Sequence, residues 1–175
     1  MEPMIHLEYQ IDPIWDVVKQ IRERVGAALT AYSEDVRLAS QMTASELIEN
    51  AVKYGSGISA GAGISFDLTA TDDQIMIVVS NRILTQEDYV EVQRHLARLN
   101  APGASAEALY LERLQVLLAA EHSEEKTQLG LYRIAYEGQF SLDYRYEQDI
   151  LTMIAVREVY RAEGSAISGR GEDTR

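Results

Sequence analysis

The chain has 175 residues, enough for one folded domain with a sizeable core. Its 46% hydrophobic and 25% charged residues are typical of a globular protein and exclude a disordered chain. The 28 acidic and 16 basic residues give a net charge of −12, which opposes binding to nucleic acid and to anionic membranes.

The first half of the chain shows one strand pattern and two helix patterns. Apolar and polar residues alternate over 4–10, which predicts a half-buried strand. Apolar residues then recur at helical spacing over 13–30 and over 33–54, and Gly55 is a suitable helix end. The segment 56–63 is rich in glycine and serine, which predicts a loop.

A hairpin pattern follows. Strand-like runs at 64–70 and 74–80 are joined by a polar turn at 71–73. Helical spacing returns over 85–100 and 105–121, and the apolar residues of both segments indicate helices that pack on the domain or on a partner.

The C-terminal part predicts a helix over 128–137 and a closing hairpin with strands at 140–146 and 150–156. The glycine-, serine- and charge-rich segment 162–175 indicates a disordered tail. We therefore expect one domain over 1–161.

The element order predicts an α/β (α+β) two-layer sandwich, because the strands come mainly as hairpins and the helices need one sheet face to cover. The sheet is expected to be mixed and mostly antiparallel. The chain has no cysteine, the start at 1–10 lacks the features of a signal peptide, and no apolar run reaches the ~20 residues that cross a bilayer. We expect a cytoplasmic protein.

The segment 44–55 carries the residues best suited to chemistry. Glu46, Asn50 and Lys53 recur at helical spacing and share one face. A carboxylate can accept a proton, a carboxamide oxygen can ligate Mg²⁺, and a lysine can face phosphate. The same three residue types also fit an ordinary solvated helix surface.

Family resemblance adds to this interpretation. Ser45-Glu46, Asn50-Ala51 and Tyr54-Gly55 resemble the N-box of the histidine-kinase-like ATPases, the GHKL or Bergerat superfamily, and are nearest to the anti-sigma-factor serine kinases. The resemblance implies the histidine-kinase-like ATPase fold, with Glu46 as base or water-orienting residue and Asn50 as Mg²⁺ ligand. Lys53 matches the histidine-kinase form of the motif.

A second match lies at 127–134, which resembles the family box Gly-Leu-Gly-Leu-x-x-Ile. In the family this box opens a helix and places backbone N–H groups against phosphate, a role that the resemblance gives to Gly130.

Three departures from the family pattern stand out. The adenine box Asp-x-Gly-x-Gly is replaced by Ser80-Asn81-Arg82-Ile83, where Asn81 or Ser80 is the available substitute acceptor. Gln128 stands where the second box has its first glycine. The family's flexible lid corresponds to 84–126, which has one glycine and helical periodicity. We therefore expect the segment 84–126 to be ordered. Because the two glycine boxes are altered, we also expect weak or altered binding of ATP and Mg²⁺.

Three functions remain open. The first is a bacterial signalling regulator that binds a protein partner, by resemblance a sigma factor, an antagonist or a response regulator. The second is an active serine/threonine protein kinase with Glu46 as base, Asn50 on Mg²⁺, and Lys53 with Gly130 at the phosphates. The third is an autonomous ATPase. A homodimer also remains open, and the scattered histidines at 6, 95 and 122 favour surface or capping roles over a metal site.

Overall fold

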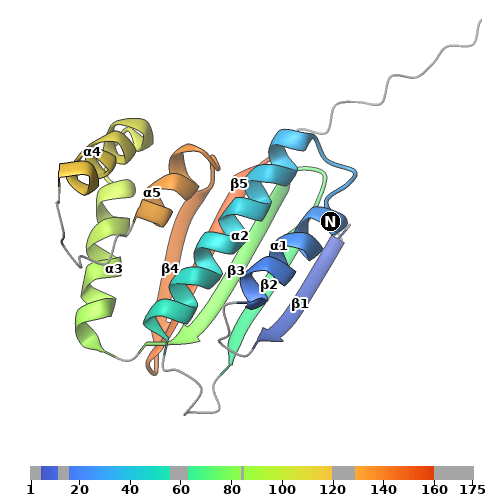
Figure 1. Ribbon diagram of the computed structural model, residues 1–175, viewed down its shortest axis with the longest axis horizontal. Coiled ribbons are helices and arrows are strands. Elements are labelled where there is room, and N and C mark those ends of the chain that lie inside the picture. Colours follow the sequence, from blue (N-terminus) through green and yellow to red (C-terminus); the bar gives the residue numbers. More distant parts are fainter. Residues whose placement is uncertain (1–4, 12–15, 56–62, 84, 120–128, 160–175) are drawn as a thin grey trace, which may run out of the picture.

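The computed structural model, drawn in Figure 1, has one five-stranded sheet with its helices on one face. It describes residues 5–11, 16–55, 63–83, 85–119 and 129–159. The elements in chain order are β1 (Ile5–Ile11), α1 (Asp16–Ala28), α2 (Glu34–Tyr54), β2 (Ile64–Ala70), β3 (Gln74–Arg82), α3 (Gln86–Leu99), α4 (Ala106–Ala119), α5 (Leu129–Tyr136), β4 (Ser141–Glu147) and β5 (Ile150–Glu158).

The strand order is β1-β2-β3-β5-β4, and every neighbouring pair runs antiparallel. The α+β class with an antiparallel sheet is thus confirmed, whereas the expectation of a mixed sheet is wrong for the described strands. The reason is the place of β5. β4 runs in the same direction as β3, but β5 folds back between them and pairs antiparallel with both.

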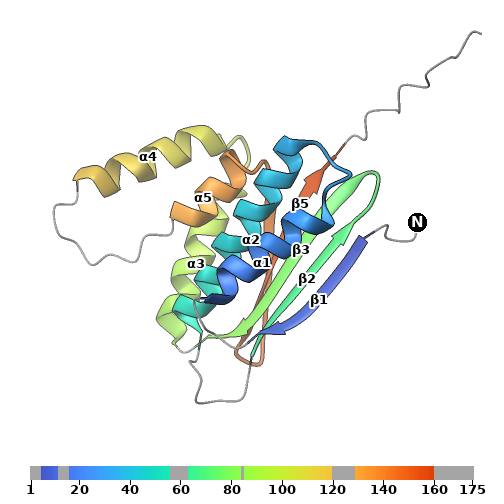
Figure 2. The same ribbon diagram turned by 45° about the vertical axis from the view of Figure 1, so that its right-hand side comes forward.

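The described helices, α1 to α5, all lie on one side of the sheet, as predicted (Figures 1 and 2). The core lies between these layers, because alternate residues of the central strands point toward the helices and are buried. Phe66, Leu68, Ile77 and Ala155 are fully buried there, together with Ile48 of α2. This packing fixes α2 above the centre of the sheet.

The ends of α2 agree with the sequence prediction. Ser33 is the N-cap, and its Oγ accepts a hydrogen bond from the Val36 N–H at 3.3 Å. The helix ends at Tyr54, but Gly55 has an extended backbone (φ −76°) rather than the left-handed one of a typical glycine cap. A Cβ at residue 55 would lie 2.4 Å from the Ala51 carbonyl oxygen, so the close approach of backbone explains the glycine.

The segment expected to replace a lid is described over 85–119, where it forms two regular helices. α3 buries Val92, His95 and Leu96 against the domain. The sequence predicted a surface or capping role for His95, and this prediction is wrong. The His95 side chain is buried between α3 and α5, with Nδ1 2.7 Å from the Tyr132 hydroxyl oxygen. α4 differs from α3, because none of its described residues is fully buried.

Several sequence predictions fall outside the described residues: the start of the first helix at 13–15, most of the loop at 56–63, His122, Gln128 and the tail at 162–175. Within the described part, no helix combines the length and the apolar character that a bilayer crossing needs.

Candidate functional site

One face of α2 and the start of α5 surround a polar cavity of about 380 Å³. The predicted residues Glu46, Asn50 and Lys53 line it from α2, and Gly130 lines it from α5. The helical spacing of the three α2 residues places them side by side, and the contact between the two helices adds the glycine. The remaining lining residues are Glu49, Leu129 and Arg133.

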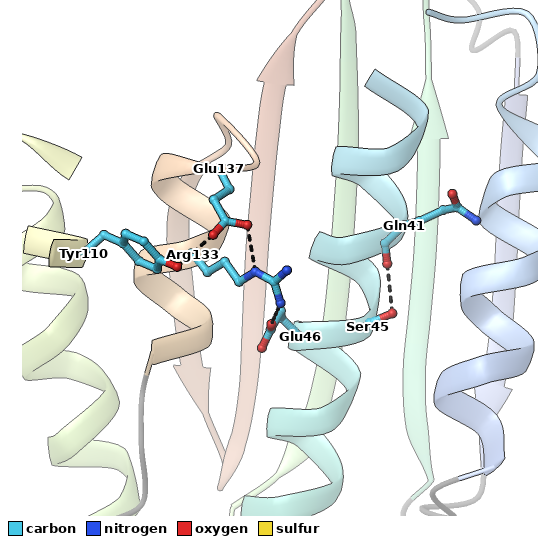
Figure 3. Close-up of polar contacts among 6 residues, drawn as sticks. All are labelled: Gln41, Ser45, Glu46, Tyr110, Arg133 and Glu137. Carbon is cyan, nitrogen blue, oxygen red and sulfur yellow. Dashed lines mark hydrogen bonds and ion pairs between the residues drawn. The ribbon is translucent and has the colours of Figure 1, made fainter. Parts of the chain in front are cut away.

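Glu46 forms an ion pair with Arg133 of α5, and Figure 3 shows the network around it. Arg133 donates from Nη1 to Glu46 Oε1 at 3.1 Å and from Nε to Glu137 Oε2 at 2.8 Å. Tyr110 of α4 donates its hydroxyl to Glu137 Oε1 at 2.8 Å. A continuous chain of polar contacts therefore runs from α4 through α5 to the carboxylate of Glu46.

The two carboxylates of this network have opposite electrostatic environments. Burial, followed by the nearby Glu49 carboxylate, raises the pKa of Glu46, and the hydrogen bond from Arg133 offsets only part of this rise. The hydrogen bond from Arg133 is the main cause that lowers the pKa of Glu137. Arg133 thus stabilises the charged form of Glu137 more effectively than that of the less exposed Glu46.

Gly130 permits this close contact between α5 and α2. A Cβ at residue 130 would lie 2.4 Å from Glu46 Oε2 and 3.2 Å from Glu46 Cδ. The neighbouring Ser45 does not face the cavity network, because its hydroxyl donates back to the Gln41 carbonyl at 2.9 Å within α2 (Figure 3).

Asn50 offers an unused polar group. Its Nδ2 is buried and has no hydrogen-bond partner among the described residues. Buried polar groups without a partner are uncommon in folded proteins and suggest a missing ligand or water. The two ends of a carboxamide are interchangeable in assignment, so this group suits a phosphate oxygen as a donor or Mg²⁺ as an acceptor.

Little space remains next to Asn50 on the side of the sheet. This space is a cavity of about 20 Å³, with room for about one water molecule. Val92 of α3 and Leu131 of α5 are among its lining residues, and Asn81 of β3 lies on its wall. Small-molecule sites are usually of roughly 300 Å³ or more, so this space does not accept a purine ring.

The two candidate adenine acceptors point to opposite faces of the sheet. Asn81 is buried on the helix side, where its Nδ2 donates to the carbonyls of Ala51 at 3.5 Å and Arg82 at 3.3 Å. Ser80 is on the other side and shares a 2.9 Å hydrogen bond with the Thr152 hydroxyl. Ser80 is therefore not a substitute acceptor in this arrangement, and Asn81 holds the end of α2.

The residues present thus fit one part of ATP with Mg²⁺ and not the other. The cavity on the phosphate side has sufficient volume and the unpaired carboxamide of Asn50. Its two cationic side chains, Lys53 and Arg133, stand beside the two carboxylates of Glu46 and Glu49. The adenine side has neither the space nor the acidic acceptor.

Sequence reasoning missed Arg133, Glu137 and Tyr110. Two local signals existed, since Arg133 lies three residues after Gly130 and four before Glu137 on one helix. Tyr110 gave no signal, because its contact with Glu137 depends on how α4 packs on α5.

Comparison with known protein families and with curated protein sequences finds no match to this chain. The resemblance to the histidine-kinase-like ATPases therefore depends on the motif residues at 45–55 and 127–134.

Proposed function

We propose that this chain is a bacterial signalling regulator that acts by binding another protein and has an altered nucleotide site. The observation that carries the proposal is the small cavity at Asn81, which has room for about one water molecule. The resemblance aligns this part of the chain with the family's adenine box. The ion pair between Glu46 and Arg133 supports the proposal, because it engages the carboxylate that catalysis needs as a base.

The exposed apolar residues favour a partner-binding surface on α3 and α4. Four of the seven large hydrophobic side chains found exposed in the described residues lie on these two helices, namely Val90, Leu111, Val116 and Leu118. Leu118 is 77% exposed. Leu111 and Leu118 are seven residues apart on α4 and so share one face of that helix. By the family resemblance the partner is a sigma factor, an antagonist or a response regulator.

A binding experiment with matched variants tests this function. The tagged chain is used to recover its partner, and the recovery is compared for Leu118→Asp and for the double variant Glu46→Ala/Asn50→Ala. We expect the first to lose the partner and the second to keep it. Loss of the partner only in the double variant, with both variants folded by circular dichroism, would contradict the proposal.

The second candidate function is an active serine/threonine protein kinase. The unpaired Asn50 carboxamide beside the 380 Å³ cavity favours it. In this role Glu46 accepts the proton of the substrate hydroxyl, Asn50 holds Mg²⁺ and Lys53 faces the phosphates, while ATP supplies the phosphoryl group. Incubation of the recovered partner with ATP and Mg²⁺ tests it, because Glu46→Ala should abolish the transfer of phosphate.

A further inference from the structure

A cluster of three potential metal ligands lies on strands β1 and β2. Asp67 alternates with the buried Phe66 and Leu68, so the cluster lies on the sheet face opposite the helices. His6 and Glu8 are two residues apart on β1, so both side chains point to the same face. The register pairs Glu8 directly with Asp67 on β2 and His6 with Thr69. Backbone pairing alone therefore brings an imidazole and two carboxylates together.

The distances are close to those of a coordination sphere. One ligand atom from each of the three residues lies within 4.8 Å of the other two. Asp67 Oδ2 lies 3.5 Å from His6 Nδ1, and Glu8 Oε2 lies 3.8 Å from the other ring nitrogen, Nε2, so the two carboxylates approach different nitrogens of the imidazole. Tetrahedral bonds of 2.0–2.2 Å put neighbouring ligand atoms roughly 3.3–3.6 Å apart. The Glu8 side chain is 67% exposed, so its carboxylate has room to turn toward the nitrogen that Asp67 approaches.

Thr69 orients one of these ligands. Its hydroxyl donates to Asp67 Oδ1 at 3.2 Å, which leaves Oδ2 on the side of His6. The same hydroxyl oxygen lies 3.3 Å from His6 Nδ1, a contact that an ion bound to this nitrogen would replace. Such a hydrogen bond to a ligating carboxylate is a common way to fix its orientation in metal sites.

We propose that His6, Glu8 and Asp67 form a surface site for a divalent transition-metal ion of the Zn²⁺ class. An imidazole nitrogen with carboxylate oxygens suits such ions better than Mg²⁺ or Ca²⁺, which prefer oxygen ligands alone. Two carboxylates balance the charge of the ion, and the net charge of −12 attracts cations. The three protein ligands leave further coordination positions open to water.

The same cluster without a metal is a histidine placed between two carboxylates, and the two interpretations differ in measurable ways. A metal ion needs the neutral imidazole, so its affinity falls as the pH is lowered. Without a metal-binding role, the three side chains are joined only by their polar contacts, and the chain takes up no Zn²⁺ through them.

Calorimetric titration of the full, tag-free chain with Zn²⁺ tests the site, because a polyhistidine tag would itself bind the ion. We expect one Zn²⁺ per chain and a loss of affinity of more than about 100-fold in His6→Ala. Thr69→Val should weaken binding by about tenfold. The matched control is Asp143→Asn, which removes an exposed carboxylate from β4 at the opposite edge of the sheet and should leave binding unchanged.

Binding of one Zn²⁺ that survives both His6→Ala and Asp67→Asn would overturn the proposal. The absence of Zn²⁺ binding at millimolar concentration would also overturn it. Circular dichroism of each variant shows that the strands remain folded.

Discussion

Arg133 Nη1 lies 3.1 Å from Glu46 Oε1, so the carboxylate that the family resemblance marks as the base is paired with a guanidinium from the neighbouring helix. The same guanidinium is shared with Glu137, which Tyr110 also contacts. The state of Glu46 is therefore tied to the packing of α4 and α5. This relationship is the basis of the first three predictions.

Removal of the guanidinium should destabilise the fold. In Arg133→Ala the partly buried Glu46 loses its cation, which should cost about 1–2 kcal/mol of unfolding free energy, between the values for surface and for buried pairs. Urea denaturation measures it. Arg145→Ala, on the exposed side of β4, is the control and should change stability by less than about 0.5 kcal/mol. Equal losses of unfolding free energy in the two variants would show that the Arg133 contact does not stabilise the fold more than an exposed arginine does.

The contact between Gly130 and Glu46 should appear as coupling in a double-mutant cycle. Alanine is the better helix former by about 1 kcal/mol, but in the wild type its Cβ would meet Glu46 Oε2 at 2.4 Å. Gly130→Ala should therefore be neutral or destabilising in the wild type and stabilising by about 0.5–1 kcal/mol in Glu46→Ala. Denaturation of the four proteins measures the coupling, and additive effects would contradict the contact.

The raised pKa of Glu46 should appear in the pH dependence of stability. Glu46 binds its proton more tightly in the folded chain than in the unfolded chain, because burial disfavours the charged carboxylate. Its contribution is therefore complete below the ordinary glutamate pKa and is lost as the pH rises through the raised value. Between these two pKa values, stability should fall less with rising pH in Glu46→Gln than in the wild type.

Urea denaturation at a series of pH values checks this slope. Glu23→Gln is a suitable control, because Glu23 is 67% exposed on α1. Parallel pH curves for Glu46→Gln and the wild type would mean that the pKa of Glu46 is not raised.

The sequence was sufficient to predict most of the fold, because its features are local. Alternation predicted β1 and β2, helical spacing predicted α2 over 33–54, and the closing hairpin predicted a turn between its strands at 140–146 and 150–156. Gln148 and Asp149 in that turn have positive φ angles of 51° and 64°. The place of β5 between β3 and β4 could not be predicted, because it depends on contacts between distant segments.

The candidate site divides in the same way. The shared face of Glu46, Asn50 and Lys53 follows from helical periodicity alone. The ion pair between Glu46 and Arg133 joins residues 87 positions apart, and no local pattern predicts which cation of the chain reaches a given carboxylate. The small volume of the cavity near Asn81 likewise depends on how α3 packs, since Val92 of α3 is part of its lining.

Amide hydrogen exchange should differ between α3 and α4, the two helices in the segment that the resemblance aligns with the family's lid. α3 buries Val92 and Leu96, so its amides should be protected about as well as those of α2 in the absence of ligand. α4 has no fully buried residue among those described, so its amides should exchange faster. Mass spectrometry of peptides from 86–99 and 106–119 measures both. Fast exchange in both helices would indicate a mobile lid.

The most direct test of the proposed function is calorimetric titration of the chain with ATP in the presence of Mg²⁺. Loss of a charged acceptor for the adenine amino group costs about 1.5–3 kcal/mol, or roughly 10- to 100-fold in affinity. The cavity beside Asn81 is too small for a purine ring, which should weaken the binding of ATP further. We therefore predict an affinity in the high micromolar range or weaker, with no turnover by the isolated chain. Low-micromolar binding, or phosphate transfer that Glu46→Ala abolishes, would contradict the proposed function and favour the kinase.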